Sequence, residues 1–153
     1  MLITELSSVS KMIEQIKEYI EQCPYLEEFV AVNVNYLADK DTAYSINENV
    51  GYDPVIKPFI TGGGKMQFQF SFDARLKWND EIATNIDNSK FFEKFRDWLE
   101  DNNRNKILPN IDGIKSEKIK AITNGYIFTT NADEAIYRIG CIFYYLKEED
   151  IWK

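Results

Sequence analysis

The stretch Met66-Gln67-Phe68-Gln69-Phe70-Ser71-Phe72-Asp73-Ala74-Arg75-Leu76 decides the fold, because apolar and polar residues alternate along its whole length. Such alternation is typical of a β-strand whose two faces meet different surroundings. The phenylalanine face has to pack on a core, and the glutamine face has to be solvated or buried in a polar interface. The sequence therefore predicts a long strand over Met66–Leu76 in a sheet that is covered on its apolar face.

A helix is predicted ahead of this strand. Apolar residues recur at i, i+3 and i+4 from Val9 to Cys23, while charged residues fill the other face. Ser7 or Ser8 can cap its N-terminus, because a short hydroxyl accepts a hydrogen bond from the unpaired amides of the first turn. Pro24 ends the helix.

A second helical segment is predicted after the strand, from about Asp80 to Asn102. We interpret Asn88-Ser89 as a break and a new cap within it. Beyond this point an aromatic stripe is expected to pack on the apolar face of the sheet, and it comprises Phe91, Phe92, Phe95, Trp98 and Leu99. Replacing Trp98 with alanine should cost about 3–5 kcal/mol if that ring is fully buried.

Further strands are predicted on both sides of these elements, at Val30–Tyr36, Thr42–Ile46, Ile119–Thr123, Gly125–Thr130 and Ala135–Leu146. The last is apolar on both faces and is expected to lie centrally in the sheet. Asn124-Gly125 either bends one strand or forms a type I′ turn, and Asn131–Glu134 is a hairpin loop. Together these elements predict an α+β fold, a mostly antiparallel sheet packed against two main helices in a single domain spanning 1–153.

The segment Asn47–Gly64, NENVGYDPVIKPFITGGG, does not fit a regular element. It is expected to be a long loop or arm, because it combines glycines and prolines, which interrupt regular structure, with several apolar residues. Such an arm either folds back on its own domain or docks on a neighbour. For the second case we expect it to be weakly held in a lone subunit, with an assembly interface made by Tyr52, Val55, Ile56, Phe59 and Ile60.

Composition excludes several classes of protein. The chain has 153 residues, a formal net charge of −7 and no histidine. The acidic balance disfavours specific nucleic-acid binding, and the lack of histidine removes His-dependent catalysis and His-containing zinc sites. Two cysteines without a CxxC pattern are expected to be reduced. We find no pattern of a signal peptide or membrane span and expect a soluble protein of a reducing cytoplasm.

No pattern of catalytic or cofactor-binding residues emerges. Gly62-Gly63-Gly64-Lys65 lacks the Walker spacing and the hydroxyl residue after lysine, and we interpret it as a flexible hinge. Glu148-Glu149-Asp150 lacks the glycine and ligand spacing of a calcium loop. The aromatic residues lie on apolar faces and are expected to fill the core. We therefore predict no enzyme activity, no cofactor and no metal.

Several segments occur in an order that resembles a known family. They are KEYIEQCPYL, VNYLADKDTAYSI, QFQFSFDAR, NIDNSKFFEKFRDWLEDNN and KIKAITNGYIF followed by DEAIYRIGCIFYYL, covering about residues 10 to 146. The chain is similar to minor structural proteins of phages of Gram-positive hosts that are interpreted as tail terminators. Members often carry a chloramphenicol-resistance label, but acetyl transfer to chloramphenicol relies on a catalytic histidine, which this chain lacks.

The resemblance implies a virion or phage-tail-like particle protein, assembled in the bacterial cytoplasm. Tail terminators form a ring, commonly a hexamer, on the head-proximal end of the tail tube and meet the head connector. The implied partners are further copies of the chain, tube and sheath proteins, and the connector; a monomer in solution is compatible with this. Two alternatives stay open: another head–tail joining or tube component, and a small acidic immunity- or inhibitor-type binding module.

Overall fold

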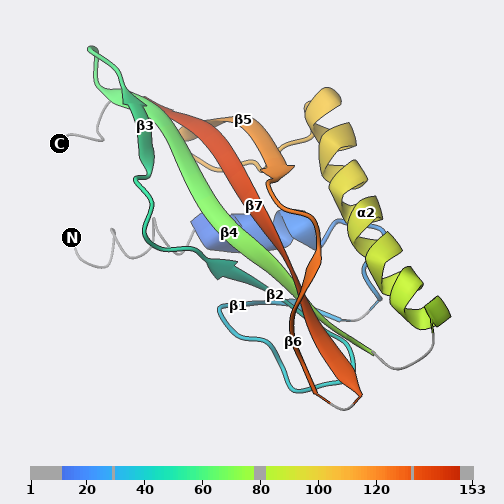
Figure 1. Ribbon diagram of the computed structural model, residues 1–153. Helices are drawn as coiled ribbons and strands as arrows, with labels where there is room; N and C mark the ends of the chain where they lie inside the picture. Colours follow the sequence, from blue (N-terminus) through green and yellow to red (C-terminus); the bar gives the residue numbers. More distant parts are fainter. Residues whose placement is uncertain (1–11, 29, 78–81, 132, 149–153) are drawn as a thin grey trace.

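Two long strands organise the structure. In the computed structural model, which describes residues 12–28, 30–77, 82–131 and 133–148, β4 (Gly63–Lys77) pairs antiparallel with β7 (Glu134–Glu148) along its whole length (Figure 1). The predicted strand over Met66–Leu76 and the predicted central strand over Ala135–Leu146 are both confirmed. β4 and β7 lie between the other strands, and they contribute most of the sheet residues in the hydrophobic core.

The remaining strands flank this pair. The described residues form a seven-stranded sheet in the order β1-β2-β4-β7-β5, with β3 also on β4 and β6 also on β7. Every pairing is antiparallel except that of β1 with β2. The bounds are β1 Val32–Val34, β2 Ala43–Glu48, β3 Val55–Pro58, β5 Ile114–Ala121 and β6 Tyr126–Thr130. The predicted α+β class with a mostly antiparallel sheet is confirmed.

Two helical segments supply the other half of the core. Residues 12–20 are helical and the helix ends before Pro24, as predicted; its first residues and the Ser7 or Ser8 cap lie outside the described residues. Helix α2 spans Ile82–Arg104. The predicted break at Asn88-Ser89 is wrong, because α2 runs through both residues without interruption. The Asn88 side chain instead donates from Nδ2 to the Lys77 carbonyl at 2.8 Å and to the Tyr137 hydroxyl at 3.3 Å, which ties the helix to β4 and β7.

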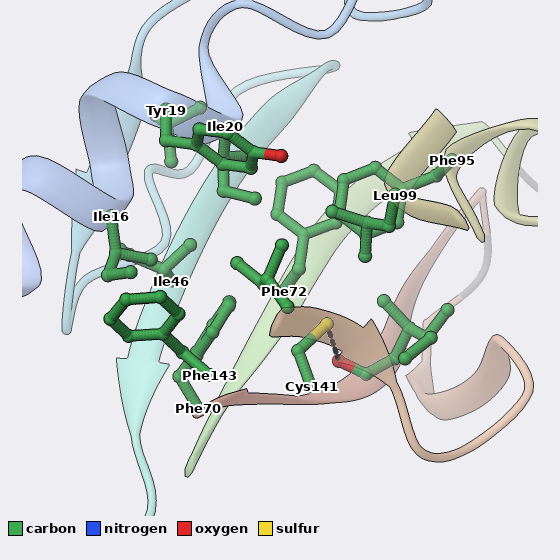
Figure 2. Packing of buried hydrophobic residues seen from close by; sticks show 14 of the residues in the cluster. Ile16, Tyr19, Ile20, Ile46, Phe70, Phe72, Phe95, Leu99, Cys141 and Phe143 are labelled. Atoms are coloured by element: carbon green, nitrogen blue, oxygen red, sulfur yellow. Dashed lines mark hydrogen bonds between the residues drawn. The ribbon is translucent and has the colours of Figure 1, made fainter. Parts of the chain in front are cut away.

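The aromatic stripe of α2 packs on the apolar face of the sheet, as predicted. Phe95 is completely buried and its ring stacks on Phe72 of β4 with 4.7 Å between centroids (Figure 2). Phe92 stacks on Tyr137 of β7 at 5.5 Å. Trp98 is only partly buried, between the two helices, with Tyr19 at 5.3 Å. The condition for a large Trp98→Ala effect is therefore not met.

Two predicted strands have clearly different bounds in the structure. The strand predicted over Val30–Tyr36 shrinks to β1, because Asn35 adopts φ 54° and turns the chain out of the sheet. The strand predicted over Ile119–Thr123 begins earlier, at Ile114, and ends at Ala121. β5 and β6 then follow the same edge of β7, so Asn124-Gly125 bends the chain and forms no hairpin turn.

Gly125 is required there for space and not for a left-handed backbone. The φ angle of Gly125 is not positive, but a Cβ at this position would lie only 2.4 Å from Cγ of Phe92. The predicted hairpin loop at Asn131–Glu134 is confirmed, since Asn131 Oδ1 accepts from the backbone amides of Asp133 and Glu134.

The expectation that Asn47–Gly64 lacks regular structure is wrong. β2 continues to Glu48, and β3 pairs with the start of β4. A tight turn joins β3 to β4, and in it the Phe59 amide donates to the Gly63 carbonyl at 3.1 Å. Gly62 and Gly63 adopt φ 98° and 72°, and a Cβ on Gly64 would lie 2.7 Å from the Lys57 carbonyl oxygen. The glycines thus build a β-hairpin and are not a hinge.

Candidate assembly surfaces

The β3–β4 hairpin, residues 55–66, carries most of the predicted interface residues. It forms one end of the sheet, away from α2 (Figure 1). Ile60 in its turn is fully exposed and Ile56 is 42% exposed, whereas Phe59 and Val55 are partly buried. The Tyr52 hydroxyl accepts a hydrogen bond from the backbone amide of Gln69 at 3.0 Å. The structure therefore splits the predicted set: Tyr52 and Val55 anchor the hairpin, and Ile56 and Ile60 face outward.

A second exposed apolar surface lies on β6 and was missed by sequence reasoning. Tyr126, Ile127 and Phe128 are each about half exposed, at 45%, 45% and 52%. β6 pairs with β7 alone among the described strands, so its other edge presents free backbone groups. Its sequence, YIFTT, carries no charge or proline, the usual protections of an edge strand. Such a strand is adhesive unless a partner covers it.

A polar cluster on the sheet face opposite the helices joins three strands. Arg138 of β7 donates from Nε and Nη2 to the two carboxylate oxygens of Asp73 on β4, at 2.9 and 2.8 Å. Asn47 of β2 donates to Asp73 Oδ2 at 3.1 Å. The hydrogen bonds to Asp73 raise the pKa of Arg138, and the guanidinium lies 3.7 Å from the ring centroid of Phe128. At Asp73 this face of β4 is thus buried in a polar interface, one of the two predicted possibilities, whereas Gln67 and Gln69 on the same face are half-buried.

This cluster does not offer a free charge to a ligand. Asp73 is almost fully buried, with 6% of its side chain exposed, and both its oxygens are engaged. A buried polar network whose hydrogen-bonding groups are all paired favours one strand register, because a shift would leave buried groups unpaired. We therefore assign the cluster to holding β2, β4 and β7 in register and to orienting Phe128 on the adjacent β6.

A groove of about 580 Å³ lies beside β1, between the end of the first helix and the loop that follows it. Glu21, Glu27 and Glu28 line it together with apolar residues such as Leu26 and Val30. The Glu27 amide donates to the Tyr44 hydroxyl at 3.1 Å, which fastens the loop to β2. This hydrogen bond ties one side of the groove to the edge of the sheet.

The cysteines are both free and buried, as predicted. Burial raises the pKa of Cys23, which lines the groove, to about 11, and it raises the pKa of Cys141 in the core as well. Both thiols are therefore protonated at neutral pH, and the thiolate is the reactive form of cysteine.

Within the described ranges, no group of three or more acidic or cysteine side chains is placed to hold a metal ion. No described helix is both long and apolar enough to cross a membrane. Among the described residues, the hairpin, the β6 edge and the groove are the candidate contact surfaces. No protein-family model matches the chain, and no curated protein matches it.

Proposed function

We propose that this protein is a tail terminator, which caps the head-proximal end of a phage or phage-like tail tube as a ring. The resemblance over about residues 10 to 146 suggests this class. The observation that carries the proposal on the structural side is the presence of two separate exposed apolar surfaces on one rigid sheet, at the hairpin turn and along β6. Exposed apolar surfaces of this kind mark sites of contact with other proteins.

A ring subunit has to touch a neighbour on each side and the tube beneath it. Those demands need several surfaces that point in different directions, and a heterologous contact closes into a ring when its rotation allows. The small inhibitor-type module needs only one surface for a 1:1 complex, so the two surfaces favour the ring. Another head–tail joining component would share this geometry. The length of the tails in particles made without the gene distinguishes the two roles.

The proposal gives the chain a set of partners and a place. These are further copies of itself, most simply six, the tube and sheath proteins, and the head connector, in a virion or tail-like particle assembled in the bacterial cytoplasm. With a net charge of −7 per copy, DNA could pass through such a ring without adhering, because negative charge repels phosphate. The role requires no cofactor and no catalysis.

We propose that the hairpin turn contacts the tube, because it projects at one end of the sheet and Ile60 in it is fully exposed (Figure 1). This contact gives the first test. Ile60→Asp should weaken binding to isolated tail tubes about tenfold or more, since burying an isoleucine contributes about 1.5–3 kcal/mol. Val50→Asp is the matched control, because Val50 is equally exposed but lies outside the turn. The effect is measured by electron microscopy, as the fraction of tube ends that carry labelled protein. Equal end occupancy by the Ile60 variant and the unaltered protein would remove the hairpin from the tube contact.

A further inference from the structure

One edge of the sheet is basic, although the chain as a whole is acidic. Strand β5 reads IKSEKIKA, and Lys115 and Lys118 are exposed. Its acidic residue, Glu117, lies 4.0 Å from Lys65 of β4 and is thereby partly neutralised. Lys120 is half-buried and lies 5.9 Å from the ring centroid of Tyr144 on β7, so its cation lies over the sheet and not at the edge. The β5 edge therefore presents two exposed lysines, Lys115 and Lys118, to its surroundings.

The opposite edge of the sheet is acidic. The strand order puts β1 and β5 at opposite ends, and Val30 and Ala31 of the groove lead directly into β1. Glu21 is held by Lys17 at 3.1 Å and by the Val32 amide at 3.2 Å. The other two carboxylates of the groove, on Glu27 and Glu28, are exposed, and among the described lining residues there is no lysine or arginine, although Lys17 pairs with Glu21.

From this segregation we propose that the β5 edge of one subunit docks in the groove beside β1 of a second copy. Opposite charges at opposite edges favour head-to-tail contact, whereas a two-fold contact through either edge would set like charges against each other. The contact repeats from subunit to subunit and so rests on, and deepens, the proposed ring by naming its neighbour interface.

Apolar residues on the same two edges supply area that the charges alone lack. The exposed β6 strand continues the β5 edge along β7, and Pro24, Leu26 and Val30 line the groove. A stable specific contact buries about 800 Å² on each partner, more than two lysines can cover. The lysines therefore set orientation and partner choice, and the β6 side chains add the apolar part of the interface.

Charge reversal tests this interface. One variant carries Lys115→Glu and Lys118→Glu, and the other carries Glu27→Lys and Glu28→Lys. Each variant alone should fail to self-associate, because both edges then carry the same sign. An equimolar mixture should restore association, because each edge again meets its opposite. At Ile119 the Asn103 side chain of α2 already bonds both backbone groups of the β5 edge. Glutamates protect the rest of the edge against unspecific strand pairing as well as lysines do, so a purely protective role of the lysines predicts no change.

Sedimentation at millimolar protein measures the association. We expect the unaltered protein to associate at about 10 mM salt, where the Debye length is about 30 Å, and to dissociate at about 1 M salt, where it is about 3 Å. Lys90→Glu with Lys106→Glu, both on or just after α2, makes the same change in net charge and should leave association intact. Circular dichroism confirms that each variant folds.

Three outcomes would overturn the interface: no association of the unaltered protein at low salt, normal association of either variant alone, or a mixture of folded variants that stays monomeric. Each of these leaves the terminator proposal standing if tails made without the gene still overrun their length. Restored association in the mixture would support the interface even if the particle proved to use the ring differently.

Discussion

Replacing Phe95 with alanine is expected to lower the free energy of unfolding by about 3–5 kcal/mol, the range for deleting a fully buried aromatic ring. Phe95 has no exposed surface, stacks on Phe72 at 4.7 Å and contacts Trp98 at 6.0 Å between centroids. Its ring therefore fills the space between α2 and β4, and the helix cannot close the cavity without leaving the sheet. Urea unfolding followed by circular dichroism measures the change.

Phe128→Ala provides the matched control, because this phenylalanine is 52% exposed. It should cost less than about 1 kcal/mol, mainly through the lost contact with the Arg138 guanidinium. Equal losses for Phe95 and Phe128 would contradict the assignment of Phe95 to the centre of the core.

Arg138→Met should be the next most damaging change, at about 3 kcal/mol. It leaves the Asp73 carboxylate buried without its cation, and breaking a buried ion pair from one side costs about 3–5 kcal/mol. The lower end applies because 28% of the Arg138 side chain still reaches water. The same unfolding measurement detects the loss.

The double variant Arg138→Met with Asp73→Val isolates the cause. Removing both charges takes away the unpaired carboxylate, so the double variant should be more stable than Arg138→Met alone. Asn47 retains Ser45 and Ser71 as hydrogen-bond partners in that variant. A double variant less stable than Arg138→Met alone would mean that the carboxylate stabilises the sheet by contacts other than its pair with arginine.

Periodicity predicted the parts of the fold in which local pattern and burial coincide. The alternation from Met66 to Leu76 and the apolar run from Ala135 to Leu146 became β4 and β7, and the stripe on α2 packs on them as expected. Patterns failed where distant partners decide. Asn88 resembles a helix cap, yet it lies within the continuous helix Ile82–Arg104, where its side-chain amide donates to Lys77 and Tyr137.

In the glycine-rich segment, too, the sequence pattern alone gave the wrong prediction. Glycines in series suggested mobility, but Gly62 and Gly63 supply positive φ in the turn, and Gly64 leaves room for the Lys57 carbonyl. The adhesive character of β6 was also beyond the sequence, because YIFTT is ordinary inside a sheet and unusual only at an open edge. Which strand forms that edge depends on the strand order of the whole chain.

Tail length in particles made without this gene tests the central proposal most directly. A terminator stops tube growth, so its loss should give tubes that overrun their normal length and fail to join heads, as measured by electron microscopy. Tails of normal length that do not join heads would reassign the chain to a connector role. Tails of normal, uniform length that still join heads would contradict the proposed function.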